Sequence, residues 1–171
     1  MTKPFLHCLL AVLLLVVVVQ ASGWAQTTDF SGTWVFEPSK SNGEPTVPRI
    51  FNTGGAKPTS PNLVIKQTPT ELSVVMGDAQ LLYKLDGTEA NISATGRAGF
   101  PTGKTLWDGG KLVINLTQEV FNAAKGDYVK VTGKEVYRLD KGVLTIEKSE
   151  NQLDGTTQSR KLVFTKAKVS S

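Results

Sequence analysis

The chain has little of what most catalytic and metal sites require. Its 171 residues include one cysteine, one histidine and 8% aromatic residues. Zinc sites with nitrogen or sulfur ligands, histidine-bound haem, and Ser-His-Asp or Cys-His catalytic groups all depend on side chains that are scarce here. Hydrophobic residues make up 40% of the chain, so a protein of this length can still bury a sizeable core. We therefore expect a globular protein that is not an enzyme and holds no metal or cofactor.

The first 25 residues have the order of a secretory signal peptide. Lys3 precedes an unbroken apolar run at 9–19, and Gly23 and Ala25 then occupy the small-residue positions of a cleavage site. An uncleaved membrane anchor is the alternative, but the run is shorter than the ~20 residues that a spanning helix needs. We predict a signal peptide at 1–25 and a secreted or periplasmic protein with no stable membrane span after cleavage.

Cleavage would also remove Cys8 and His7, so the mature chain would contain neither residue type. The loss of Lys3 would lower the formal net charge of +4 by one. The remaining basic residues are interspersed with acids, which is typical of an ordinary solvated surface. We expect no nucleic-acid partner.

From residue 62 onward the sequence favours strands. Short runs rich in Val, Ile, Leu, Thr and Tyr alternate with Gly and Asp, and several place apolar residues at every second position. Leu72, Val74 and Met76 share one face in this way. The sequence shows no sustained apolar period of 3.6, so little helix is expected. The runs that we expect to be strands are 62–68, 71–76, 80–85, 105–107, 111–121, 128–139, 143–149 and 157–166.

Turn residues separate these runs. Glycine supplies positive φ angles, and the aspartate side chain accepts hydrogen bonds from the nearby backbone. Each Asp- and Gly-containing turn sequence therefore indicates a hairpin between neighbouring runs. An open meander would leave two strand edges exposed, whereas closure removes them. We predict an all-β fold, an antiparallel meander of about 8–10 strands closed into a barrel, as a single domain at 26–171. The turn sequences are Gly77-Asp78, Asp86-Gly87, Asp108-Gly109-Gly110, Asp140-Lys141-Gly142 and Asp154-Gly155.

One stretch differs from the rest. Residues 38–61 contain five prolines and three glycines, and proline cannot donate the hydrogen bonds of a central strand. We expect a long loop here, either a plain surface loop or a lid across a cavity mouth.

The segment Gly32-Thr33-Trp34 resembles the Gly-x-Trp opening of calycins, the superfamily of lipocalins and fatty-acid-binding proteins. With Ser31 before it and Lys40-Ser41 after it, the segment is also similar to secreted bacterial proteins of unassigned function. The resemblance implies a lipocalin-like barrel that this strand opens, with the tryptophan near the closed end. It also implies a basic residue over the tryptophan, for which Arg160 or Lys161 is the candidate.

The leading functional hypothesis is a small apolar or amphipathic ligand held inside the barrel. Plain core packing is the alternative for every candidate lining residue, because small barrels fill their interiors with side chains. Arg138 would anchor an anionic group, although the Arg-x-Tyr clamp of fatty-acid-binding proteins is missing. The candidate lining residues are Tyr83, Phe100, Trp107, Phe121 and Tyr137.

Two other functions compete with ligand binding. A filled barrel would be an interaction module that engages an envelope protein or polymer through its loops, especially 38–61. A carboxylate-dependent hydrolase would use Glu119, Glu135 and Glu147, but we expect these side chains to face solvent because glutamate is rarely buried. An apolar cavity of a few hundred Å³ would favour the ligand, and a filled interior would favour the module.

Overall fold

The computed structural model describes residues 27–46, 58–96 and 99–168. The predicted signal peptide and residues 47–57 of the proline-rich stretch lie outside this part. The described residues form ten strands and one 3-10 turn, η2 (Pro38–Lys40). The strands are β1 (Gly32–Phe36), β2 (Leu63–Gln67), β3 (Glu71–Met76), β4 (Ala79–Lys84), β5 (Ala90–Asn91), β6 (Thr102–Asp108), β7 (Lys111–Asn122), β8 (Asp127–Asp140), β9 (Val143–Asn151) and β10 (Thr157–Lys166).

All ten strands belong to one antiparallel sheet in the order β4-β3-β2-β1-β10-β9-β8-β7-β6-β5. The first strand therefore lies between the second and the last, which is how a meander curls towards closure. The two ends of the sheet meet where the Leu82 amide donates to the Ile92 carbonyl at 2.9 Å and Leu81 bridges Ser93. The predicted all-β meander closed into a barrel is confirmed, with closure nearly complete.

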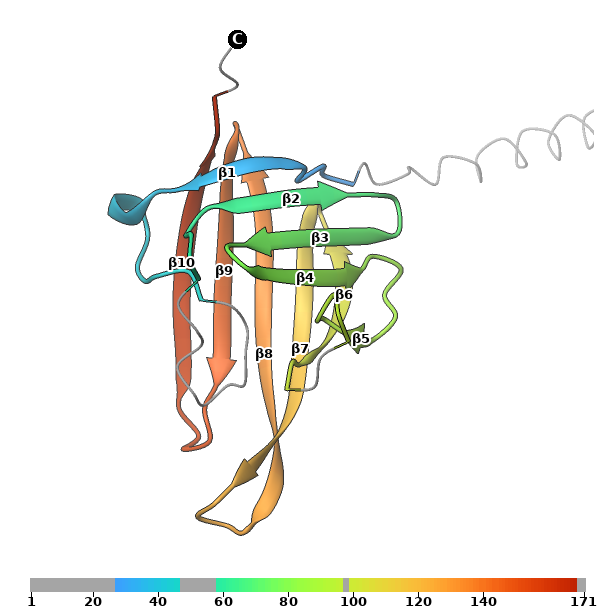
Figure 1. Cartoon of the computed structure of the whole chain (residues 1–171), viewed down its shortest axis with the longest axis vertical. Helices are drawn as coiled ribbons and strands as arrows, with labels where there is room; N and C mark the ends of the chain where they lie inside the picture. Colours follow the sequence, from blue (N-terminus) through green and yellow to red (C-terminus); the bar gives the residue numbers. More distant parts are fainter. Residues whose placement is uncertain (1–26, 47–57, 97–98, 169–171) are drawn as a thin grey trace, which may run out of the picture.

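The sheet folds over so that its two halves face each other. In Figure 1, β2, β3 and β4 cross in front of β8, β9 and β10 at a steep angle. The hydrophobic core lies between the halves and takes one side chain in two from most strands. Leu72, Val74 and Met76 are all buried, as their alternation predicts.

The predicted turns lie between strands. Gly109 and Gly110 have φ angles of 54° and 80°, so this two-residue connection of β6 and β7 needs left-handed backbone at both positions. Aspartates shape two other turns, since Asp86 and Asp154 each accept hydrogen bonds from a threonine two residues later. These bonds favour the ionised carboxylate and lower the pKa of both aspartates.

The β7–β8 hairpin reaches beyond the barrel. β7 has 12 residues and β8 has 14, whereas β2 has five. Figure 1 shows the two strands crossing and continuing below the other strands to an isolated tip. We call residues 119–130 the hairpin tip. The barrel therefore supports a protrusion with its own surface.

Candidate functional site

A charged cluster lies inside the barrel. Glu135 of β8 and Lys148 of β9 face each other directly in the strand register. Their Oε1 and Nζ atoms are 2.7 Å apart, and the side chains are 2% and 5% exposed. The expectation that Glu135 faces solvent is wrong. Its side chain lies on the inward face of β8, and Lys148 supplies the opposite charge there.

Two tyrosines complete this cluster, which we call the interior cluster. The hydroxyls of Tyr83 and Tyr137 donate to Glu135 Oε2 at 3.2 and 3.3 Å. Tyr83 comes from β4, so the cluster joins the two facing halves of the sheet. Burial raises the pKa of both tyrosines well above its ordinary value, and the nearby Glu135 carboxylate adds to the effect.

The other interior candidates belong to the packed core. The rings of Phe30 and Trp107 stack with centroids 6.1 Å apart, and Phe30 meets Tyr137 edge to face at 6.0 Å. Trp107 and Phe100 are partly buried against the core. The structure thus brings Tyr83, Trp107 and Tyr137 into one packed region.

Two of the proposed ligand-binding residues lie outside the core. Phe121 is 52% exposed on the hairpin tip, and Arg138 is exposed on the outer face of β8. Arg138 follows Tyr137 directly, so it points to the opposite face of its strand. Lys148, which the sequence analysis did not select, is a buried cation inside the barrel. Its alternation with Leu144 and Ile146 is the signal that could have identified it.

The opening segment is packed as a structural element. Trp34 is 1% exposed, and its Nε1 donates to the Phe30 carbonyl at 3.0 Å. Lys166, rather than Arg160, lies over the tryptophan, with Nζ 5.7 Å from the ring centroid. Gly32 has a φ of 147°, and a Cβ there would approach the Lys166 side chain to 2.9 Å. The glycine therefore makes room for the lysine that covers the tryptophan.

Arg160 organises the start of the proline-rich stretch. Its guanidinium donates to Thr46 at 2.8 Å and to Gln158 at 2.7 Å. Its side chain also packs against Gly43, where an added Cβ would lie 3.3 Å from Arg160 Cδ. Asn42 accepts a hydrogen bond from the Lys161 amide nearby. These contacts fix the described residues 42–46 against β10.

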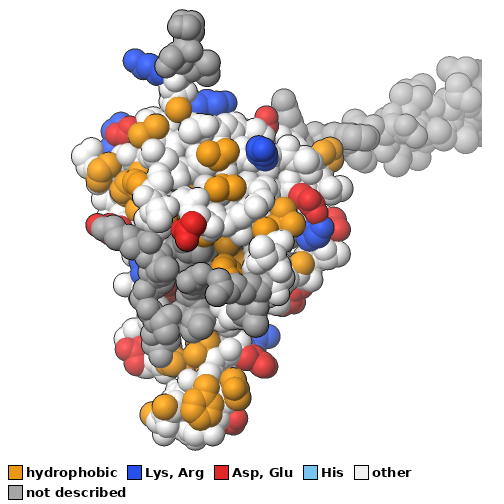
Figure 2. Space-filling model, in the orientation of Figure 1, with side chains coloured by type: hydrophobic (Ala, Val, Ile, Leu, Met, Phe, Trp, Pro, Cys, Tyr) orange, Lys and Arg blue, Asp and Glu red, His pale blue; other side chains and the backbone are white. Residues whose placement is uncertain are grey.

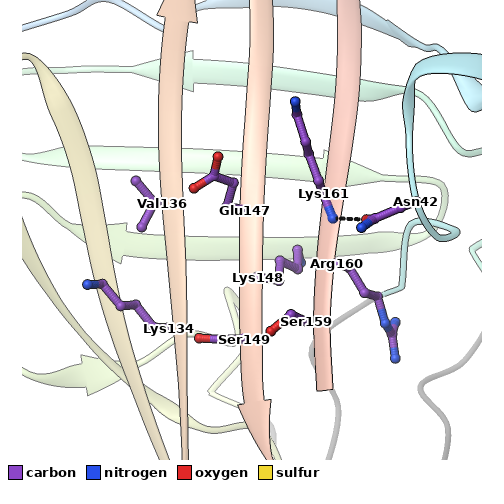
Figure 3. A pocket seen from close by; sticks show the side chains of 9 residues that line it. All are labelled: Asn42, Lys134, Val136, Glu147, Lys148, Ser149, Ser159, Arg160 and Lys161. Carbon is purple, nitrogen blue, oxygen red and sulfur yellow. Dashed lines mark hydrogen bonds between the residues drawn. The ribbon is translucent and has the colours of Figure 1, made fainter. Parts of the chain in front are cut away.

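Two depressions lie on the outer face of the sheet. The larger has a volume of about 390 Å³, and in Figure 3 its side chains come from β8, β9, β10 and Asn42. The Lys134 and Lys161 side chains extend away from Ser149 and Ser159 in that view, so the two amino groups do not converge on one point. A neighbouring depression of about 300 Å³ shares Lys134 and Ser149 and is otherwise lined mainly by Asn and Thr.

The hairpin tip carries exposed aromatic rings. Phe121 and Tyr128 face each other in the register, with ring centroids 5.4 Å apart, and Tyr128 is 66% exposed. Figure 2 shows hydrophobic side chains gathered at this end of the molecule. Two of the exposed large hydrophobic side chains of the described residues therefore lie side by side on this protrusion.

The three glutamates proposed for hydrolysis are not brought together. Glu119 is exposed on the hairpin tip, opposite Lys130. Glu147 is exposed on the outer face of β9, and Glu135 is inside. Within the described residues, there is no group of three His, Cys, Asp or Glu side chains that could hold a metal ion. None of the described helices is long and apolar enough to span a membrane.

Comparison with protein-family models, with curated proteins and with solved structures finds no match to this chain. The functional argument therefore depends on the geometry of the residues themselves.

Proposed function

We propose that the protein is a non-enzymatic interaction module, a packed β-barrel that presents the hairpin tip to a component of the cell envelope. The observation that carries this proposal is the exposed Phe121–Tyr128 pair at the end of a hairpin that extends beyond the barrel. Scattered exposed apolar side chains are common on protein surfaces, but here two exposed rings contact each other at the end of a protrusion, which favours an interaction site.

The interior supports the same conclusion. Core aromatics stack on each other, and the tyrosine hydroxyls are occupied by Glu135. Side chains that are already packed and hydrogen-bonded leave less for a ligand to contact. The barrel then acts as a rigid base for the hairpin.

The test removes the hairpin tip and leaves the barrel intact. Val120 and Val129 face each other, so residues 121–128 can be replaced by Asn-Gly, a two-residue turn. We expect the exported protein to sediment with the envelope fraction of its own cells and the shortened variant to stay in solution. The melting temperature should change by no more than ~3 °C, because the removed side chains are mostly exposed.

Leu106→Ser is the matched control, since Leu106 is 59% exposed on β6, on the barrel wall. It should sediment like the unaltered protein. Equal sedimentation of the shortened variant, or no sedimentation of the unaltered protein, would show that the hairpin tip is not an attachment site.

A second candidate function, ligand binding inside the barrel, is favoured by the interior cluster. A buried ion pair stabilises a fold poorly because of its desolvation, so a charged pair in a core is a candidate site for a polar head group. A fatty-acid analogue and an uncharged lipophilic dye are suitable probes. Binding should raise the melting temperature and change tryptophan fluorescence, and Lys148→Met should weaken only the charged probe. If neither probe changes either signal, this function is dismissed.

A relationship to calycins is part of the same proposal. It is supported by the position of Gly32-Thr33-Trp34 in β1, next to the last strand, and by Lys166 over the buried tryptophan. Export to a periplasmic or extracellular location, which the sequence of residues 1–25 suggests, would place the hairpin tip in contact with the envelope.

A further inference from the structure

The turn of the hairpin tip is preorganised by hydrogen bonds within the tip. The Asn122 carbonyl accepts the amides of Lys125 and Gly126, and its side-chain oxygen accepts the Ala124 amide at 3.0 Å. Gly126 has a φ of 69°, which the turn requires. The edge-to-face contact of Phe121 with Tyr128 favours this arrangement of the two rings. Binding would therefore require little further ordering of this segment.

The size of the apolar tip argues against a protein partner. Two aromatic side chains of ~200 Å² each, exposed to 52% and 66%, offer roughly 250 Å². A stable protein interface buries about 800 Å² of total surface on each partner, and a little over half of that area is apolar, so the two rings supply only about half of the apolar share. The tip is also convex and narrow, which suits insertion into a soft phase better than contact with a flat surface.

The charges of the tip are balanced. Glu119 lies opposite Lys130 across the hairpin, and Lys125 and Asp127 occupy the turn. The tip therefore has no excess charge that an anionic surface would attract. Tyrosine and phenylalanine beside small alanines suit the boundary between lipid head groups and acyl chains, where a tyrosine ring is buried and its hydroxyl stays wet.

We propose that the hairpin tip inserts Phe121 and Tyr128 into the interfacial layer of a lipid bilayer without help from anionic lipid. This inference rests on the proposed function, because it names the partner of the same hairpin. Attachment is peripheral and reversible, since two aromatic side chains contribute far less apolar area than a spanning segment.

The experiment uses vesicles of phosphatidylcholine alone and vesicles with added phosphatidylglycerol. We expect the exported protein to bind both with similar affinity, and to bind equally at about 0.5 M salt, where surface charges are screened within a few Å. The double variant Phe121→Ser/Tyr128→Ser should bind at least ~10-fold more weakly, and Leu106→Ser should bind normally. In Phe121→Trp, the new tryptophan should be quenched by brominated lipid.

Each other outcome overturns the inference in a distinct way. Binding that needs phosphatidylglycerol or is lost in salt would assign attachment to the lysines. Absence of vesicle binding, together with hairpin-dependent sedimentation with envelopes that protease treatment abolishes, would identify a protein partner and leave the proposed function standing. Absence of both vesicle and envelope binding would overturn both proposals.

Discussion

At the scale of the residue, the interior cluster is the most unusual arrangement in the barrel. Removing a carboxylate and an ammonium group from water costs several kcal/mol per ion, and their attraction offsets this only when the geometry is good. Glu135 meets that condition, because Lys148 and two tyrosine hydroxyls bind its two oxygens. The cluster is therefore a set of mutually dependent groups.

We predict that the two charges of this pair are strongly coupled. Glu135→Gln leaves Lys148 without its countercharge, and Lys148→Met leaves Glu135 without its cation. Each single change should lower the free energy of unfolding by about 3–5 kcal/mol, and the double variant should lose much less than the sum. Urea denaturation of the four proteins measures this coupling.

The exposed pair of Glu71 and Lys84 provides the comparison. Its side chains are 36% and 40% exposed, so solvent screens the interaction. The same double-mutant cycle there should give a much smaller coupling than at Glu135 and Lys148, because water screens exposed charges. Additive effects at Glu135 and Lys148 would contradict the account of a mutually dependent pair.

We also predict a loss of stability at high pH that depends on the interior cluster. The pKa of Tyr83 and of Tyr137 is raised in the folded protein, so their contribution is complete below the unfolded value of ~10 and decreases as the pH rises above it. Urea midpoints measured from neutral pH to about pH 11 should fall steeply above ~10. Tyr83→Phe/Tyr137→Phe should be less stable at neutral pH but show a shallower fall, and an unchanged slope would contradict this.

The alternation of β7 and β8 sorts the candidate residues better than residue type does. Leu112, Ile114 and Leu116 mark the inward face of β7, which leaves Phe121 outside. Tyr137 marks the inward face of β8, which places Glu135 inside and Arg138 outside. The sequence therefore contained this information. Residue type pointed the other way, because glutamate is usually exposed and phenylalanine is usually buried. The side chains that contact Glu135 and Phe121 in these positions, Lys148 and Tyr128, belong to other strands.

At the scale of the element, most strands were predictable because their turns are chemically explicit. The runs at 71–76 and 157–166 match β3 and β10 at both ends. The run at 105–107 is extended to Thr102–Asp108 in β6, since pairing with a long β7 continues where apolar alternation stops. β5 was missed because two residues carry no periodicity, and only their pairing with β6 defines them.

The hairpin shows what strand prediction leaves out. The runs at 111–121 and 128–139 agree closely with β7 and β8, yet their length alone does not tell how far they extend past the barrel. That depends on where the neighbouring strands end. The shorter β6 begins at Thr102, opposite Thr117, so the last residues of β7 have no strand partner on that side among the described residues. The candidate attachment site therefore arises from unequal strand lengths.

At the scale of the whole molecule, closure depends on one narrow seam. β4 and β5 are the outer strands of the sheet order, and few groups connect the two ends. One is the Leu82 amide bond to Ile92. Another is Thr105 of β6, 3% exposed, whose hydroxyl donates to the Lys84 carbonyl at 2.6 Å. The sequence predicted that the barrel closes, because an open meander would leave two exposed edges. It did not predict these particular bonds, which join residues 10 and 21 positions apart that no local pattern connects.

We predict that the seam opens when Thr105 is changed to Val. The Lys84 carbonyl would lose a buried donor, which should cost about 1–3 kcal/mol, and the loss should appear first as local opening. Hydrogen exchange at the Leu82 amide should become at least ~10-fold faster, while amides of β8 and β9 keep most of their protection. Thr165→Val removes a hydroxyl bond to Glu37 at 2.7 Å, away from the seam, and should leave Leu82 unchanged. Equal acceleration at all strands would mean that the barrel opens only by unfolding as a whole.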